Sequence, residues 1–249
     1  MRDVVIAGYL RTAQSRSRPN DPPRDWFHKL RADDLMAKLL PEVIKRTGVK
    51  AEEIDDFIVG SSIGVSENWA YGGRTPIWLA NLPETMPAKF VDQQCGSSMA
   101  SIHIGFMEIA MGYADIVMVG GMENMTRVPM GGTLTEKGAI SLNMRLFTEP
   151  AYKHWDMMTT TNMGLTAEKL FTQRGFTKEE MDRWGTRSHQ LASKAYKEGF
   201  FKDEILPIEA EQADGKILVV DRDQAVRDDA TLEGMKNLKP AFTPDGVIT

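Results

Sequence analysis

Short apolar runs alternate with longer segments of helical spacing in the first half of the chain, and this order limits the folds open to it. Runs typical of strands lie at residues 4–8, 57–60, 89–91 and 115–119. Segments of helical spacing lie at residues 35–44, around 77–79 and at 99–111. Continuous apolar strands are typical of sheets covered on both faces, and strands that alternate with helices favour a layered α/β domain. The sequence therefore predicts an α/β fold with a mixed or parallel sheet.

The segment from Met99 to Met111 is apolar nearly all the way round. Its large apolar side chains are Met99, Ile102, Ile104, Phe106, Met107, Ile109 and Met111. A helix without a polar face is normally a buried one. We therefore predict a buried central helix in the core, with His103 as a packed residue on it.

The regular spacing of apolar residues is lost from about residue 124. Residues 125–160, which include Gly131-Gly132, carry several methionines and no strong period. They predict an extended loop region. We therefore divide the chain into a core domain at residues 1–123 and a second, loop-rich domain at residues 124–249.

The second domain carries one clear helix signal. Thr177 and Glu180 match a capping box. It opens an amphipathic helix that runs to about Lys197, with Gly199 as its stop. The apolar run at residues 217–220 predicts a further strand.

Composition and charge narrow the function classes. The formal net charge is −5, and Lys and Arg are interspersed with Asp and Glu, which argues against nucleic acid as a partner. The sequence has one cysteine, so an intrachain disulfide is impossible and a reducing compartment fits. No apolar run approaches the length that spans a bilayer, and the first residues lack a signal-peptide pattern. We expect a cytoplasmic protein that binds neither nucleic acid nor membrane.

The single cysteine, Cys95, lies between the strand near residue 90 and the apolar helix that begins near Ser97. The unpaired amides and the dipole of a helix amino terminus stabilise negative charge, which favours the reactive thiolate. Gly96 removes side-chain bulk beside the sulfur, so a substrate could approach it. The alternative is an inert, buried structural cysteine, because free cysteines are among the most buried residues.

Several blocks of the sequence, taken in order, resemble the amino-terminal half of the thiolase family. They are Arg11-Thr12, Cys95-Gly96-Ser97-Ser98, Gly120-Gly121-Met122-Glu123-Asn124-Met125 with Pro129, Met163-Gly164 through Glu168, and Asp221-Arg222-Asp223 with Arg227 and Leu238 through Phe242. Together they cover nearly the whole chain. The resemblance implies a thiolase-like layered α/β core half followed by a loop domain.

The resemblance also implies an activity, which is acyl transfer between coenzyme A and a second acyl-CoA. The position that matches the nucleophile is Cys95, which would carry the acyl group as a thioester while its backbone N–H holds the thioester oxygen. Cysteine suits this exchange because a thiolate attacks thioesters readily and leaves readily. Coenzyme A enters as a substrate, and no cofactor or metal is implied.

The family's loop domain carries most contacts with coenzyme A. Arg227 matches an arginine near the nucleotide, and a guanidinium suits phosphate or adenine recognition. Met163 matches a residue that lines the acyl pocket, and Gly234 replaces a serine that touches coenzyme A in some members. For Arg227 the alternative is a surface charge, and for Met163 it is ordinary core packing. Glu123 is interpreted as structural, because a carboxylate after a strand can hold neighbouring loop amides.

The family's general base, a second cysteine and a water-orienting asparagine lie in its carboxyl-terminal half, beyond the segment that this sequence matches. None of the four histidines is assigned the missing role, and His28, His154 and His189 are expected to be solvated. We predict that the 249-residue chain alone is inactive, although its thiol is still open to alkylation. A complete site would need a continuation of the chain or a second subunit. The family also implies a homodimer or homotetramer, for which the strand near residues 89–93 could pair across the interface.

Two alternatives stay open, one because the chain departs from the family pattern and one because the β-ketoacyl synthases share the fold and a cysteine at the same helix. Asp92 stands where the family commonly has asparagine, Ser98 where it has glycine, and Asn162 where short-chain biosynthetic members have histidine. One alternative is a non-catalytic thiolase-like subunit that binds coenzyme A or assists assembly. The other is a relative of the β-ketoacyl synthases, against which the Gly120 to Glu123 block argues.

Overall fold

The computed structural model describes residues 2–130 and 143–249, so the predicted loop glycines Gly131-Gly132 lie outside the described residues. The chain divides into two compact units. The first comprises Met1–Ala139 and Phe201–Ala225, and the second comprises Ile140–Phe200 and Val226–Thr249.

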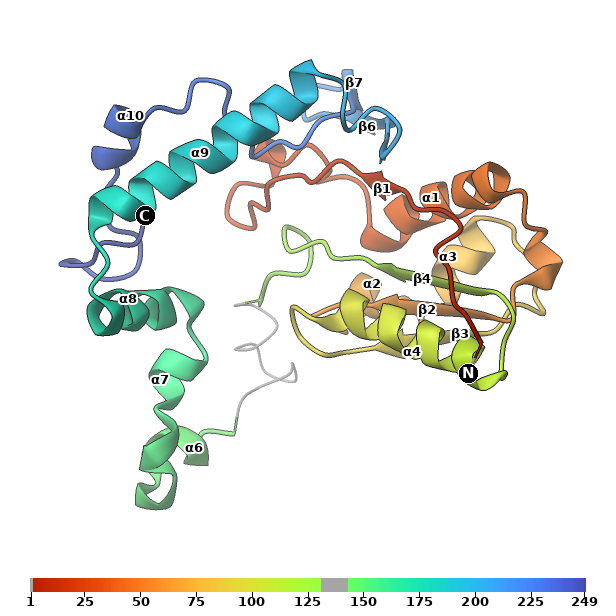
Figure 1. The fold of residues 1–249 in the computed structure, drawn as a ribbon, viewed down its shortest axis with the longest axis horizontal. Coiled ribbons are helices and arrows are strands. Elements are labelled where there is room, and N and C mark those ends of the chain that lie inside the picture. Colours follow the sequence, from red (N-terminus) through yellow and green to blue (C-terminus); the bar gives the residue numbers. More distant parts are fainter. Residues whose placement is uncertain (1, 131–142) are drawn as a thin grey trace. The chain divides into compact units, whose positions relative to one another are not determined.

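The first unit alternates strands and helices as predicted, except for the strand expected at residues 4–8 (Figure 1). Its elements are β1 (Arg11–Thr12), a 3-10 turn (Pro22–Arg24), α1 (Ala32–Thr47), a second 3-10 turn (Ala51–Glu53), β2 (Asp56–Gly60), α2 (Ser66–Trp69), α3 (Arg74–Leu79), β3 (Ala88–Val91), α4 (Ser97–Met111), β4 (Val117–Gly121), β5 (Ile205–Leu206), β6 (Ile208–Glu211) and β7 (Ile217–Val220). The predicted α/β class is confirmed.

A parallel sheet with the order β3-β2-β4 forms the centre of this unit. In its register Gly60 lies opposite Val91 on one neighbour and Gly121 on the other. The carboxyl ends of these parallel strands therefore meet at one edge of the sheet. In open α/β sheets this edge is where ligands bind.

Side chains of β2 alternate between two covered faces, as the pleat of a strand requires. Phe57 and Val59 are fully buried in the core that α1 and α3 supply, with Met36 and Ile77 among its members. The opposite face of the sheet carries α4. Gly105 on α4 lies so close to β4 that an added Cβ would come within 2.9 Å of a methyl carbon of Val119.

The prediction of a buried central helix is wrong for this chain taken by itself. The side of α4 that is buried carries small residues, among them Ala100, Ser101 and Gly105. Its large apolar side chains, Met99, Ile102, Phe106, Met107 and Met111, are exposed. The physical reason is that the described residues of this unit cover α4 with the sheet on one side only, whereas an apolar period cannot tell which side finds a partner. His103, predicted to be packed, is likewise exposed.

The strand predicted at residues 4–8 is absent from the described structure, which gives residues 2–10 no regular element. Val5 and Ile6 are each 82% exposed. A strand needs backbone hydrogen-bond partners, and an apolar run supplies only the side chains. Strand structure in this region begins at β1, where Arg11 and Thr12 pair in parallel with Ile205 and Leu206.

Arg11 links β1 to two carboxylates that lie about 200 positions later in the sequence, those of Glu204 and Asp223. Its guanidinium donates to both carboxylate oxygens of Asp223, at 2.7 and 3.1 Å, and to Glu204. Partial burial by itself lowers the pKa of Arg11, but these hydrogen bonds outweigh it and raise the pKa above its ordinary value. Two blocks of the family resemblance, Arg11-Thr12 and the one that contains Asp223, are thus partners in space.

This pairing explains why the compact units differ from the predicted division at residue 123/124. Residues 201–225 belong to the first unit because they pair with β1 and Arg11. The predicted division rested on the change in sequence pattern near residue 124 and on the family's contacts with coenzyme A. The division into compact units does not test either of these. It stays a prediction.

The second unit is helical in its described residues. Its elements are α6 (Arg145–Thr148), a 3-10 segment (Pro150–Trp155), α7 (Met157–Thr160), α8 (Met163–Arg174), α9 (Lys178–Lys197) and α10 (Leu232–Lys236). Short helical turns thus occupy much of the region predicted as an extended loop. The predicted capping box is confirmed: Thr177 Oγ1 accepts from the Glu180 N–H, and the Glu180 carboxylate accepts from the Thr177 N–H. Among the described residues, the structure holds no helix both apolar and long enough to cross a membrane.

The carboxylate of Asp55 gives the first unit a pH dependence. It accepts the backbone N–H groups of Asp115 and Ile116, at 2.7 and 3.0 Å, and so joins the approach to β4 to the start of β2. These bonds lower the pKa of Asp55 below its ordinary value. Its stabilising contribution is therefore present above an ordinary aspartate pKa of about 4 and is lost as the pH falls through the lower, folded value.

We expect Asp55→Ala to lower the thermal unfolding midpoint at pH 7 and to differ progressively less from the parent chain below about pH 4. Midpoints from circular dichroism at a series of pH values measure this. The exposed Glu52→Ala, in the same unit, is the control that should show no such convergence. A difference that stays constant down to the acid limit would contradict the role given to Asp55.

Candidate active site

Cys95 lies in the turn between β3 and α4, and its residue is exposed. The alternative of a buried structural cysteine is therefore wrong. Two backbone hydrogen bonds shape the turn, from the Gly96 N–H to the Gln93 carbonyl at 3.0 Å and from the Ser97 N–H to the Gln94 carbonyl at 3.1 Å. The thiol is thus presented at the surface by a tight turn that leads directly into a helix.

The residue before the cysteine has an unusual backbone conformation. Gln94 has a φ of 51°, in the left-handed region that residues other than glycine seldom adopt. Such a conformation costs about 1–3 kcal/mol and persists only where its surroundings fix it. Asp92 contributes, because its carboxylate accepts the Gln94 N–H at 3.0 Å. The aspartate that stands in place of the family's asparagine therefore helps to hold the turn.

Ser97, at the start of α4, holds the other side of the turn. Its side chain is almost fully buried, with the residue 2% exposed. Its hydroxyl oxygen accepts the Gln93 N–H at 2.9 Å and lies within hydrogen-bond distance of two carbonyls, those of Gln94 at 2.6 Å and Ser61 at 3.1 Å. A hydroxyl has one proton, so it donates to one of these carbonyls at a time.

The first turn of α4 packs against the ends of β2 and β4 because glycine stands at both. A Cβ built on Gly60 would lie 2.4 Å from the backbone carbon of Ser97. A Cβ on Gly121 would lie 2.6 Å from the Cβ of Ser98. The helix that follows Cys95 can therefore begin directly at the carboxyl edge of the sheet, and its free amides and dipole stabilise an anion there.

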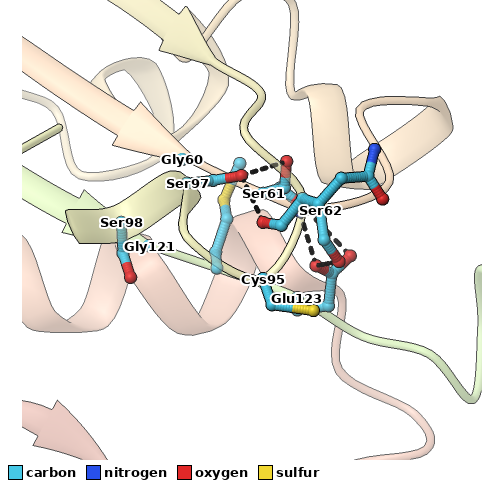
Figure 2. A pocket seen from close by; sticks show the side chains of 10 residues that line it. Gly60, Ser61, Ser62, Cys95, Ser97, Ser98, Gly121 and Glu123 are labelled. Carbon is cyan, nitrogen blue, oxygen red and sulfur yellow. Dashed lines mark hydrogen bonds between the residues drawn. The ribbon is translucent and has the colours of Figure 1, made fainter. Parts of the chain in front are cut away.

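Cys95 lines a hollow of about 270 Å³ at this edge (Figure 2). The residues around it are Gly60, Ser61, Ser62, Gln94, Cys95, Ser97, Ser98, Gly121, Met122 and Glu123. They come from the ends of β2 and β4 and from the cysteine turn, so one edge of the sheet supplies the whole wall. A thiol, hydroxyls and a carboxylate line the hollow.

Glu123 is confirmed as a residue that holds loop amides. Its carboxylate accepts from the Ser62 N–H at 2.8 Å and from the Ser62 hydroxyl at 2.5 Å. It also accepts from the Ser61 hydroxyl at 2.9 Å and from the side-chain amide of Asn68 at 2.6 Å. Sequence reasoning missed Ser61, Ser62 and Asn68. The signal that could have found the two serines is their place directly after an apolar strand.

The other predicted site residues lie in the second unit. Met163 is the first residue of α8 and is 70% exposed, so core packing is wrong as its alternative role. Arg227 is exposed, and its backbone N–H donates to Nδ1 of His189 at 3.3 Å. Gly234 lies in α10, where its N–H donates to the Thr231 hydroxyl that begins the helix. The roles of Met163, Arg227 and Gly234 toward coenzyme A stay predictions.

The structure gives local roles to the family block that begins at Met163. The Asn162 side chain caps α8 by accepting from the Gly164 and Leu165 N–H groups, so the departure from histidine leaves a sound helix start. A Cβ on Gly164 would lie 2.0 Å from the ring of Phe242, which accounts for glycine there. The Glu168 carboxylate accepts backbone N–H groups from residues 247 and 248.

Comparison with known proteins adds a family match. The sequence model described as "Thiolase, N-terminal domain" matches residues 4–249. Three similar curated relatives carry the name 3-ketoacyl-CoA thiolase. They come from Chromohalobacter salexigens (35% identical over 246 residues), Saccharophagus degradans (35% over 246) and Acinetobacter baumannii (38% over 245). The matches cover 98% of this chain and 58%, 59% and 58% of these relatives, so the chain spans under two thirds of their length.

The glycine at the end of β2 can be tested directly. We expect Gly60→Ala to lower the free energy of unfolding in urea by about 1–3 kcal/mol, the cost of forcing extra volume into a packed site. Because the clash falls on the backbone at the start of α4, it should also change the rate at which iodoacetamide alkylates Cys95. Intact-mass spectrometry is a clean readout because the sequence holds a single cysteine.

Gly96→Ala is the matched control. It lies next to Cys95, but a Cβ there has its nearest neighbour at 3.4 Å, an ordinary contact. We expect it to cost less than about 1 kcal/mol, the range in which alanine and glycine differ at the start of a helix. Equal destabilisation by both variants would show that the close approach of Gly60 to α4 does not decide the position of the helix.

Proposed function

Because the chain belongs to the thiolase family, we propose that Cys95 is its acyl-accepting nucleophile and that the complete protein transfers acyl groups between thioesters of coenzyme A. The observation that carries this proposal is the exposed thiol at the start of α4, beside the hollow at the carboxyl edge of the sheet. A thiol in this place combines access for a substrate with stabilisation of the thiolate by the helix. Both are requirements of covalent catalysis through sulfur.

The proposed step is an exchange of thioesters at Cys95. The thiolate Sγ attacks the carbonyl carbon of the substrate and forms a new C–S bond. Backbone N–H groups, that of Cys95 among them, donate to the oxyanion of the tetrahedral intermediate. The intermediate collapses as the bond to the leaving group breaks, and the leaving group takes up a proton. The thiol of coenzyme A then loses its proton and attacks the acyl-cysteine, so that acyl-CoA leaves and the Cys95 thiolate is restored. The proton that it releases balances the one that the first leaving group took up.

The names of the relatives suggest a substrate class. For a 3-ketoacyl-CoA, the attack would fall on the ketone carbon, and the bond between carbons 2 and 3 would break. Acetyl-CoA would leave as its enolate and take up a proton, with the shortened acyl group held on Cys95. We propose this cleavage as the reaction of the complete protein, with coenzyme A as a substrate and without a further cofactor.

Recognition of coenzyme A is proposed for the second unit. An exposed guanidinium at Arg227 suits an anionic phosphate or a stacked adenine. The exposed side chain of Met163 offers an adaptable apolar contact to an acyl chain. The backbone at Gly234 leaves room for a ligand where a side chain would otherwise stand.

A further part of the complete protein is proposed to close the site. The chain spans about 58% of the relatives it matches, and the family resemblance places the general base and second cysteine in the remainder. The exposed apolar side chains of α4, from Met99 to Met111, support a covering layer on that face, because exposed apolar patches of this kind mark interaction sites. Homo-oligomer formation is proposed through β3, an edge strand of its sheet within the described residues.

The nucleophile can be tested with acetyl-CoA. We expect this chain to gain one acetyl group, located at Cys95 by peptide mass spectrometry, and Cys95→Ala to gain none. Circular dichroism of the variant checks that it is folded. A chain that iodoacetamide alkylates at Cys95 but that acetyl-CoA never acylates would contradict the nucleophile and would favour a non-catalytic, CoA-binding subunit.

The need for a further part of the protein can be tested by turnover. We expect the 249-residue chain alone to cleave acetoacetyl-CoA with coenzyme A far below an ordinary enzymatic rate of about 1 s⁻¹ or more. Chromatography of acetoacetyl-CoA and acetyl-CoA over time measures the rate, with Cys95→Ala as the background. Turnover at an ordinary rate by the chain alone would show that its own residues supply the proton transfers.

A further inference from the structure

Glu123 lies on the wall of the Cys95 hollow, but its carboxylate is already engaged. It accepts hydrogen bonds from the Ser61 hydroxyl, the Ser62 N–H and hydroxyl, and the Asn68 side chain. A carboxylate offers about four acceptor positions, so these bonds use its capacity. A general base would need a free position directed at the substrate. The geometry therefore indicates a structural connection rather than proton transfer.

One of these bonds leads to the cysteine turn. Ser61 is 3% exposed and its hydroxyl donates to Glu123, while its carbonyl lies 3.1 Å from the Ser97 hydroxyl. The Ser97 hydroxyl accepts the N–H of Gln93 at 2.9 Å. Gln93 stands two positions before Cys95. Figure 2 shows the links from Glu123 to Ser61 and from Ser61 to Ser97 as dashed lines.

The other end of this connection is anchored in the core. Asn68 is fully buried; its side-chain N–H donates to Glu123 and its side-chain oxygen accepts the Asn124 N–H at 3.2 Å. The Asn124 side chain in turn accepts the N–H groups of Thr126 and Arg127. The carboxylate thus has a buried, hydrogen-bonded neighbour on one side and holds Ser61 on the other.

The turn needs such a hold because it stores strain. Gln94, directly before the cysteine, has its φ at 51°. A strained residue keeps its conformation only where the surrounding bonds define it. The Ser97 hydroxyl accepts the Gln93 N–H, and its single proton alternates between the carbonyls of Gln94 and Ser61.

We propose that Glu123 is a positioning residue for Cys95, which fixes the cysteine turn through Ser61 and Ser97. It holds the thiol at the start of α4, where the helix stabilises the thiolate. The inference rests on the proposed role of Cys95, since a turn of this kind matters only if the thiol reacts. Its test reads the reactivity of the thiol, so it stands apart from the test of acyl transfer.

Glu123→Gln keeps the size of the side chain and removes two acceptor positions. Whichever way the amide turns, its N–H₂ faces an N–H donor, either that of Ser62 or that of Asn68, so the side chain at position 123 loses one of its bonds and no longer has a fixed orientation from which to hold Ser61. We expect iodoacetamide to alkylate Cys95 about three- to tenfold more slowly at pH 7, which is the range one net hydrogen bond covers. The rise of the alkylation rate with pH should also move to higher pH.

Glu108→Gln is the matched control. Glu108 lies on α4, the same helix, and pairs with Lys89 outside the connection from Glu123 to the turn. We expect it to change the unfolding free energy but neither the alkylation rate nor its pH profile. An equal effect of both variants on alkylation would reduce Glu123 to a general stabiliser.

A double-mutant cycle tests the route. Ser97→Ala removes the hydroxyl between Ser61 and Gln93, so Glu123→Gln should change the alkylation rate little in that background. If the effects of Ser97→Ala and Glu123→Gln on the alkylation rate multiply independently, the proposed route is overturned. If Glu123→Gln alone keeps the alkylation rate and pH profile of the parent chain, the positioning role is overturned. Should Glu123→Gln lose cooperative unfolding, Ser61→Ala replaces it, because that variant removes the bond to Glu123 and keeps the Ser61 carbonyl.

Discussion

The close approach of α4 to the carboxyl edge of the sheet is the constraint on which the candidate site depends. Glycine at position 60 lets the backbone of Ser97 lie where a Cβ would otherwise stand, and Gly121 makes the same allowance for Ser98. Because the helix begins at the edge, the residue two positions earlier is exposed directly above the strand ends. An exposed thiol, a helix amino terminus and a hollow are therefore consequences of one packing contact.

That contact also explains why a polar connection is needed. Because the helix packs against the strand ends, few residues are left for the turn from β3 into α4. The chain makes this short turn with Gln94 in the left-handed conformation. The side chains of Asp92, just before the turn, and of Ser97, just after it, then stabilise the turn, and the backbone carbonyl of Ser61 at the end of β2 lies within hydrogen-bond distance of the Ser97 hydroxyl. Glu123 belongs to the same set, since it holds Ser61 from the end of β4. The glycines thus allow α4 to approach the strand ends closely, and the hydrogen bonds fix the geometry of the cysteine turn.

Local patterns predicted the parts of this structure whose determinants are themselves local. The capping box at Thr177, the alternation of helices and strands from α1 to β4, and the place of Cys95 between a strand and a helix each need only a few adjacent residues, and each is present in the structure. Predictions failed where the determinant was a distant partner. The run at residues 4–8 has strand composition but no pairing strand among the described residues, and α4 has the composition of a buried helix but a cover on one side.

The pairing of Arg11 with Asp223 is a second case in which a distant partner could not be predicted from the sequence. These residues lie 212 positions apart, and neither one's neighbours in the sequence identify the other. Both residues lie in blocks that resemble the thiolase family, but the resemblance does not indicate that the two blocks are in contact. The sequence predicted that Glu123 holds loop amides, but it did not identify all the donors on the carboxylate or the link to the cysteine turn. Its hydrogen bonds extend that prediction, because a carboxylate that is fully engaged by donors can orient a nucleophile but has no acceptor left for the substrate's proton. Which role a titratable residue takes beside a nucleophile is decided by its remaining hydrogen-bond capacity, and only the fold reveals that capacity.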